Sequence, residues 1–125
     1  MTQEQKYLLL KDLCARLPYG VKCDVGDNKS CTLSRIEIDD NNGHLLDFIE
    51  MKDGLDMQVY LSEVKPYLFP LSSMNGEQEK EWLYTLSSDG NITYDTVDWC
   101  NENHLDYRGL IEKGLAIDCT NLNIY

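Results

Sequence analysis

The stretch CTLSRIEIDDNNGHLLDFIEMKDGLDMQVYL, residues 31–61, alternates apolar and polar side chains in runs that two turn-forming sequences separate. A three-residue loop over 41–43 would place a glycine at its left-handed position, and Asp53-Gly54 suits a two-residue turn. Together these loops predict a three-stranded antiparallel meander with one apolar face. The predicted cross-strand neighbours are Ile38 with Leu46, Ile36 with Phe48, Leu46 with Leu61, and Phe48 with Val59.

The segments on either side of this meander predict an α+β fold. Thr2 with Gln5 forms a capping-box pattern at the start of a helix that ends before Pro18. A short strand over 20–25 extends the sheet. We expect a single domain, 1–125, with an N-terminal helix in 1–19, a small bent antiparallel sheet of about four strands and SH3-like character in 20–74, and an acidic helical segment in 75–125.

The sequence VKPYLFPLSSM, residues 64–74, is expected to leave the sheet and form a short 3₁₀ turn. Its prolines, Pro66 and Pro70, have no N–H to donate to a strand ladder. Asn75, with Gln78 at the third helical position, then predicts a capped helix that continues to about residue 86. The proline-rich stretch therefore reads as the connection between a sheet and a helical half.

Two further helices are predicted in the second half of the chain. One is expected over residues 93–103, and a short one is expected after Asp106, which would act as its N-cap, with Gly114 as a left-handed stop. On the helix that begins after residue 75, Leu83 and Leu86 are expected to pack inward, together with one of the neighbouring aromatic side chains.

Acidic charge dominates the composition. The net charge is −11, and residues 75–125, with 10 acidic and 3 basic side chains, hold −7 of it. This charge argues against direct binding of a nucleic-acid backbone or of an anionic membrane surface, because both attract Lys and Arg. It indicates either simple solubility or an acidic surface for a basic protein partner.

The location of the protein is expected to be the cytoplasm of the cell that makes it. The longest apolar run, residues 7–10, is far too short to span a membrane, and the N-terminus has no secretory pattern. The five cysteines show neither a C-x-x-C motif nor zinc-ligand spacing, and we expect them to be mostly buried, reduced thiols. Cys23 and Cys31 would face each other across a hairpin.

Polar residues with catalytic potential cluster between residues 98 and 118. Cys100 and His104 are four residues apart, and His104 precedes Asp106 in a His-x-Asp pattern. A metal site needs more converging ligands, and a Cys-His hydrolase needs an orienting group and an oxyanion hole that the sequence does not reveal. The favoured interpretation is a helical corner in which Asp106 is a cap, His104 packs beside Trp99, and Arg108 pairs with a carboxylate.

The tyrosines are a second candidate feature. Tyr60 should point away from the core face of the sheet, and with Tyr19 and Tyr67 it would form an exposed aromatic patch of the kind that binding modules use. The equal alternative is that helices cover this face and make the tyrosines core residues.

Three motifs, RLPYGVKC at 16–23, VKPYLFPLSSM at 64–74 and DYRGLIEKGLAI at 106–117, resemble a family of small uncharacterised proteins encoded by phages, prophages and mobile elements of gut Bacteroidales. The resemblance covers nearly the whole chain. The family pattern has Arg at the position of Phe69 and Leu at that of Cys100, which argues against Cys100 as a shared nucleophile. The resemblance implies a phage context and carries over no site residue.

These observations predict a non-enzymatic accessory protein that binds a protein partner with a basic surface, in one version by blocking a host defence or nucleic-acid-handling protein. No catalytic residue, metal or cofactor is assigned. The alternatives are a sponge that holds an anionic nucleotide signal through Arg108 or Arg35, and a small hydrolase built on His104, Cys100 and Asp106. The candidate binding residues are Tyr19, Tyr60, Tyr67, His104 and Arg108.

Overall fold

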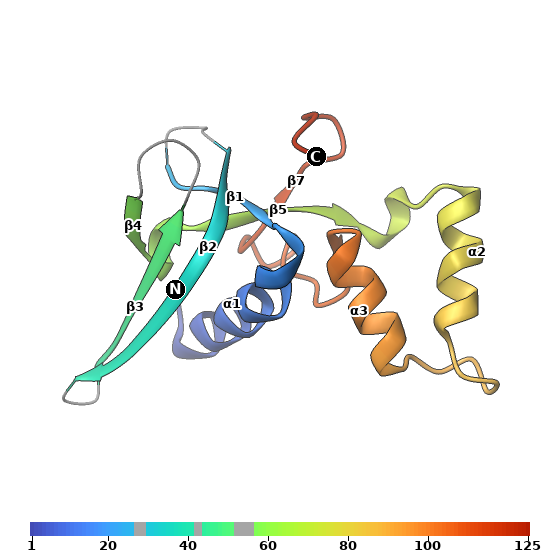
Figure 1. Cartoon of the computed structure of the whole chain (residues 1–125), viewed down its shortest axis with the longest axis horizontal. Coiled ribbons are helices and arrows are strands. Elements are labelled where there is room, and N and C mark those ends of the chain that lie inside the picture. The colour runs from blue at the N-terminus through green and yellow to red at the C-terminus, as the bar shows by residue number, and fades with distance from the viewer. Residues whose placement is uncertain (27–29, 42–43, 52–56) are drawn as a thin grey trace.

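A mixed sheet runs through the computed structural model, which describes residues 1–26, 30–41, 44–51 and 57–125 (Figure 1). Its strands lie in the order β4-β3-β2-β1-β5-β6, and β7 also pairs with β5. Neighbours are antiparallel from β4 through β5, whereas β6 and β7 run parallel to β5. The strands are β1 (Lys22–Asp24), β2 (Ser30–Asn41), β3 (His44–Met51), β4 (Met57–Tyr60), β5 (Lys65–Pro70), β6 (Leu105–Asp106) and β7 (Ile117–Asp118).

The helices confirm the α+β class, with an N-terminal helix and C-terminal helices around the sheet. Three α-helices are found among the described residues: α1 (Gln3–Arg16), α2 (Gly76–Thr85) and α3 (Tyr94–Glu102). Short 3₁₀ helices cover Leu17–Tyr19, Leu61–Glu63 and Leu71–Ser73. The SH3-like character of the sheet stays a prediction.

The β2–β3–β4 meander is present, but its register differs from the predicted one by one residue. Ile36 pairs with Ile49 rather than with Phe48, and Phe48 pairs with Tyr60 rather than with Val59. The ladder of β2 and β3 extends to the Asn41–His44 pair, so Asn41 belongs to β2 and not to the predicted three-residue loop. That loop's glycine and the Asp53-Gly54 turn lie outside the described residues.

The expectation that residues 64–74 leave the sheet is wrong, because β5 lies inside it, whereas the expected short 3₁₀ turn is present at Leu71–Ser73. β5 pairs with β1 at its start, with β7 in its middle and with β6 at its end. Phe69 donates its N–H to the His104 carbonyl, and the Leu68 carbonyl accepts from Cys119. These partners come from the C-terminal segment, so a local reading of the prolines could not reveal them.

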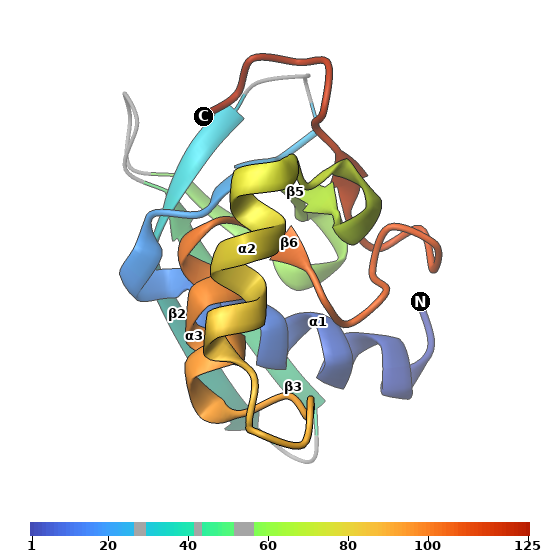
Figure 2. The same cartoon turned by 90° about the vertical axis from the view of Figure 1, so that its right-hand side faces the viewer.

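The core is one cluster to which all parts of the chain contribute. α1 supplies Leu9 and Leu13, which are fully buried, and the capping box of Thr2 and Gln5 at its start is present as predicted. Strand residues of β1, β2 and β5 and the segment 110–116 complete the cluster. In Figure 1, α3 lies between α1 and α2, and Figure 2, viewed from the side of α2, shows α2 in front of α3.

Both predicted helices after residue 75 form, and both carry a capping box. Asn75 accepts from the Gln78 N–H at the start of α2, as predicted, and Thr93 with Thr96 caps α3. The expected packing of Leu83 is wrong, because this side chain is 64% exposed. α2 has no buried residue at all.

The predicted third helix is replaced by a turn. Gly109 has a φ of 74°, in the left-handed region, so the backbone cannot continue as an α-helix directly after Arg108. The turn closes when Leu115 donates to the Leu110 carbonyl and Gly114, with φ 72°, donates to the Ile111 carbonyl. This is the hydrogen-bond pattern that ends many helices, so the left-handed stop at Gly114 is confirmed although the helix is not.

Candidate functional site

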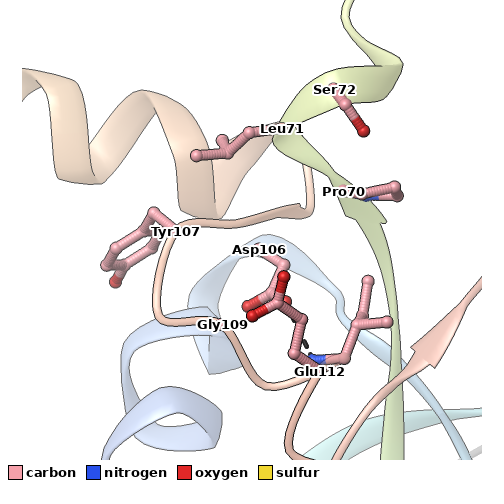
Figure 3. A pocket seen from close by; sticks show the side chains of 8 residues that line it. Pro70, Leu71, Ser72, Asp106, Tyr107, Gly109 and Glu112 are labelled. Atoms are coloured by element: carbon pink, nitrogen blue, oxygen red, sulfur yellow. Dashed lines mark hydrogen bonds between the residues drawn. The ribbon is translucent and has the colours of Figure 1, made fainter.

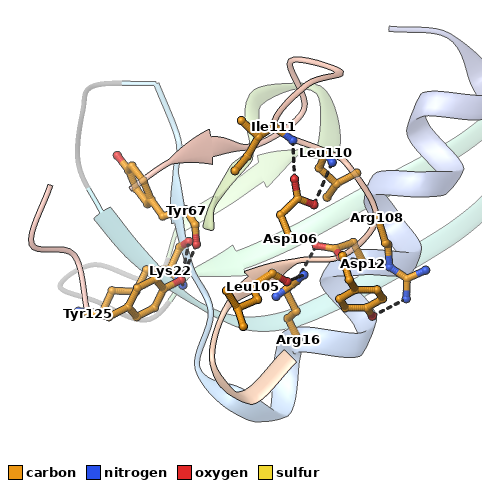
Figure 4. A network of polar contacts seen from close by, with 11 residues as sticks. Asp12, Arg16, Lys22, Tyr67, Leu105, Asp106, Arg108, Leu110, Ile111 and Tyr125 are labelled. Atoms are coloured by element: carbon orange, nitrogen blue, oxygen red, sulfur yellow. Dashed lines mark hydrogen bonds and ion pairs between the residues drawn. The ribbon is translucent and has the colours of Figure 1, made fainter. Parts of the chain in front are cut away.

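A buried ion-pair network joins α1 to the segment around β6 (Figure 4). Arg16 donates from Nε to Asp12 Oδ2 at 2.8 Å, and both side chains are fully buried. Arg16 also donates from Nη2 to the Leu105 carbonyl at 2.6 Å. Burial raises the pKa of Asp12, and the guanidinium groups of Arg16 and Arg108 oppose that rise. The network fastens α1 to the C-terminal segment.

Arg108 belongs to the same network. Its Nε lies 3.2 Å from Asp12 Oδ1, and its Nη2 donates to the Tyr107 hydroxyl at 2.9 Å. The Tyr107 ring lies under both guanidinium groups, at 4.8 Å from Arg108 and 5.4 Å from Arg16. Arg108 therefore pairs with a carboxylate, as its structural interpretation predicted.

Asp106 uses its carboxylate to hold the turn that follows it. Its two oxygens accept the N–H groups of Leu110 and Ile111, each at 2.9 Å, and the residue is buried. Asp106 is therefore a backbone cap, as predicted, although the capped element is a turn. Both oxygens are aimed at the backbone of the turn.

His104 packs on the C-terminal tyrosine. Its ring stacks on Tyr125 with 3.7 Å between centroids and 9° between planes, whereas Trp99, the predicted neighbour, contacts Trp82 on α2. The backbone of His104 has a φ of 58°, and its Nδ1 is buried without a hydrogen-bond partner in the described part of the chain. Burial, with a smaller effect of Arg16, lowers the pKa of His104 to about 4.

Cys100 is a buried thiol on the inner face of α3. Burial raises its pKa to about 11, so it is protonated at neutral pH. A thiolate–imidazolium pair needs the opposite shifts in Cys100 and His104. Over the ranges that the structure covers, no cluster of three or more His, Cys, Asp or Glu side chains is arranged to hold a metal ion.

The three candidate tyrosines occupy different environments. Tyr60 is 52% exposed at the end of β4, and Tyr19 is 36% exposed in the first 3₁₀ helix. Tyr67 on β5 is buried, so the core interpretation applies to it and it adds nothing to an exposed aromatic patch.

A cavity of about 410 Å³ opens beside Asp106 (Figure 3). Pro70, Leu71 and Tyr107 form part of its wall, and Glu112 adds a second carboxylate near that of Asp106. An anionic ligand would meet negative charge here, so this cavity does not favour the nucleotide-sponge alternative. Arg35, the other residue suggested for that role, is exposed on β2.

Among the residues whose exposure the structure describes, the most exposed apolar side chains lie on the two-helix unit formed by α2 and α3, residues 76–102. The helices touch through Trp82 and Trp99, whose rings meet edge to face at 6.2 Å, and Trp99 Nε1 donates to Glu81. In Figure 1 this unit forms the end of the molecule opposite β2–β4. The unit exposes four apolar side chains, Leu83, Tyr84, Ile92 and Tyr94, between 60% and 92%.

The surface of the two-helix unit is strongly acidic. Residues 76–102 contain seven acidic side chains, all exposed, and a single basic one, Lys80. The acidic side chains are Glu77, Glu79, Glu81, Asp89, Asp95, Asp98 and Glu102. The two-helix unit therefore combines exposed apolar side chains with most of the negative charge of the C-terminal segment.

Two features of the candidate sites escaped the sequence reasoning. Asp12 and Arg16 stand four residues apart on the same face of α1 as Leu9 and Leu13, and this spacing is a readable signal for a buried pair. The exposure of Leu83 could not be predicted from the sequence, because the spacing of apolar residues around it is that of the buried face of an amphipathic helix.

Comparison of the chain with models of protein families, with curated proteins and with solved structures gave no match. Among the helices of the described residues, none is long and apolar enough to cross a membrane.

Proposed function

We propose that this chain is a non-enzymatic protein-binding module whose acidic two-helix unit docks on a partner with a basic surface. One observation carries the proposal: residues 76–102 present seven exposed acidic side chains and one lysine on a unit whose first helix buries none of its residues. Such a surface attracts a basic partner and speeds its association.

The partner is a protein of the cell in which this chain acts, and its basic surface is one that otherwise holds nucleic acid. Clustered Lys and Arg are the usual means by which proteins bind a phosphate backbone, and the two-helix unit offers the same sign of charge. The resemblance to proteins of phages and mobile elements supports a host protein in this role. The chain would then act in the cytoplasm as an inhibitor by occupancy, without a cofactor.

In this proposal the polar residues around β6 have a structural role and do not contact the partner. Asp106 caps a turn, Arg108 pairs with Asp12, and His104 stacks on Tyr125. These contacts hold the C-terminal segment against α1 and the sheet, and so give the two-helix unit a rigid base.

The test compares variants that lose the same charge at different places. In one, Asp89→Asn, Asp98→Asn and Glu102→Gln remove three of the seven negative charges of the two-helix unit, all outside the first turn of either helix. In the matched control, Glu4→Gln, Glu63→Gln and Glu112→Gln remove three exposed charges elsewhere. Each immobilised protein captures partners from host lysate, which are identified by mass spectrometry after washes at low and high salt.

We expect the wild type and the control to retain the same partner at low salt, and the two-helix variant to lose it. High salt or added duplex DNA should release the partner, because both compete for its basic surface. A partner that stays bound equally at low and high salt would contradict the proposal.

A further inference from the structure

Four exposed apolar side chains gather at one end of the two-helix unit. Thr85, the last residue of α2, accepts hydrogen bonds through its carbonyl from the Thr93 hydroxyl at 2.8 Å and the Thr96 hydroxyl at 3.0 Å. This junction brings the end of α2 to the start of α3. Leu83 and Tyr84 directly precede it, and Ile92 and Tyr94 flank Thr93; we call these four side chains the apolar end.

The side chains of the apolar end are exposed and contribute little to the packing of the fold. A single exposed apolar side chain is ordinary, whereas a group of them marks a contact surface. Tyr84 and Tyr94 are 89% and 92% exposed, so neither ring contributes much to the packing of its own helix. The helices are held instead by the Trp82–Trp99 contact and the threonine hydroxyls. The apolar end is therefore available to a partner without loss of internal contacts.

Charge decides what occupies the apolar end. Two copies of this chain in contact here would bring together two units that each carry seven acidic side chains and one lysine, and they would repel each other. An anionic lipid surface has the same sign as the unit and is disfavoured for the same reason. A protein surface on which Lys and Arg surround an apolar pocket would pair with the acidic side chains and bury the exposed rings.

We propose that the apolar end is the central contact of the interface, and that Tyr84 and Tyr94 enter an apolar pocket rimmed by Lys and Arg on the partner protein. This inference rests on the proposed function and adds the place and chemistry of the contact. Tyrosines that are buried at the centre of an interface commonly contribute most of its affinity, while the surrounding charges steer association.

Two synthetic basic peptides test the inference on the full chain. Both carry the same number of arginines at the same positions; one has leucine and the other serine between them. Dissociation constants are measured by fluorescence anisotropy at low and high salt for the wild type, for Tyr84→Ser/Tyr94→Ser, and for Tyr7→Ser as a control. Tyr7 is a tyrosine of α1 that is 55% exposed.

The wild type and Tyr7→Ser should bind the leucine peptide at least about tenfold more tightly than the serine peptide, as expected when an anchor worth more than about 1.4 kcal/mol is buried. The Tyr84→Ser/Tyr94→Ser variant should bind both peptides equally, at the affinity of the serine peptide. Because both side chains are exposed, circular dichroism should show an unchanged fold for this variant.

The possible failures are distinguishable. Equal affinity of the wild type for the two peptides, with a strong salt dependence, would overturn the role of the apolar end and leave the charge-based function standing. Absence of binding to either peptide would contradict both proposals. Dimers of the wild type at high salt in sedimentation experiments, absent for Tyr84→Ser/Tyr94→Ser, would assign the apolar end to a second copy and overturn the inference.

Discussion

The Tyr125 hydroxyl forms hydrogen bonds with the main chain of both β1 and β5, at a position where the two strands do not bond to each other directly. Cys23 of β1 pairs with Pro66 of β5, so Lys22 and Tyr67 would form the next pair of this antiparallel ladder. Instead, the hydroxyl accepts the Lys22 N–H at 2.9 Å and donates to the Tyr67 carbonyl at 2.9 Å. Burial raises the pKa of this hydroxyl above its usual range, so it remains a donor. One side chain from the C-terminal end thereby closes a gap in the sheet.

Replacement Tyr125→Phe should remove these hydrogen bonds and keep the ring stacked on His104. Since the Lys22 N–H and the Tyr67 carbonyl would lose their partner, we expect the free energy of unfolding to fall by about 1–2 kcal/mol. Urea denaturation measures the change. Tyr94→Phe, at a residue that is 92% exposed, is the matched control and should leave the stability unchanged. Equal stability of the two variants would show that the bridge contributes nothing.

His104 predicts a pH dependence of stability. Its pKa is about 4 in the folded chain and about 6.5 in the unfolded chain, so the unfolded state binds the proton more readily. Stability is therefore fully present above about pH 6.5 and is lost as the pH falls from there towards 4. We expect this residue to account for a loss of about 1–2 kcal/mol between pH 7 and pH 5, since solvent screens part of the effect.

The variant His104→Asn isolates this contribution. Asparagine tolerates the positive φ of 58° but does not titrate, so its unfolding free energy should fall less between pH 7 and pH 5 than that of the wild type. Urea denaturation at the two pH values supplies the comparison, and any constant cost of the lost stacking cancels in it. An identical pH dependence in both proteins would mean that His104 titrates normally in the folded state.

At the scale of elements, α2 depends on local contacts more than the other helices do. It buries none of its residues, and its start is held by the reciprocal hydrogen bonds of Asn75 and Gln78, at 2.8 and 3.1 Å. A helix of ten residues has little intrinsic stability in water. The cap should therefore decide how often α2 frays.

Two neighbouring substitutions test this dependence in opposite directions. Asn75→Ala removes the cap and should cost about 1 kcal/mol, which would accelerate amide hydrogen exchange in α2 but not in β5. Gly76→Ala should stabilise α2 by about 0.5–1 kcal/mol and so slow its amide exchange. The backbone at Gly76 is helical, and nothing lies within 4 Å of the added carbon. Changes of the same sign in both variants would contradict the assignment of the cap.

Elements also differ in how readily the sequence reveals them. The boxes of Thr2 with Gln5 and of Asn75 with Gln78 were predictable because their partners are three residues apart. β5 was not, because its parallel neighbours begin at Leu105 and Ile117. The meander was predicted with the wrong register, because a difference of one residue at the end of a strand shifts every cross-strand pair.

The whole molecule is held together across the boundaries that the sequence suggested. The core cluster combines α1, strands of the sheet and Leu110, Leu115 and Ala116 from the C-terminal segment. The Asp12–Arg16–Arg108 network crosses the same boundaries. The two-helix unit could be predicted only in part from the sequence. Its acidic charge is visible in the composition, whereas the exposure of Tyr84 depends on which residues tertiary packing leaves uncovered.

The cysteines report on this core as a whole. Cys14 is exposed, while Cys23, Cys31, Cys100 and Cys119 are buried and none of the five is in a disulfide. Burial raises the pKa of Cys100 and of Cys119 to about 11, so these two thiols are protonated at pH 8 as long as they remain buried. Reaction of the four buried thiols therefore requires opening of the core.

We expect iodoacetamide to label one thiol per native chain rapidly and the other four only slowly, with mass spectrometry to count the labels. The substitution Cys14→Ser should abolish the rapid reaction. In denaturant without a reductant, all five should react. Cys23 and Cys31 are direct cross-strand partners, so the reaction of only three thiols in denaturant would reveal a disulfide between them and would contradict the reduced core described above.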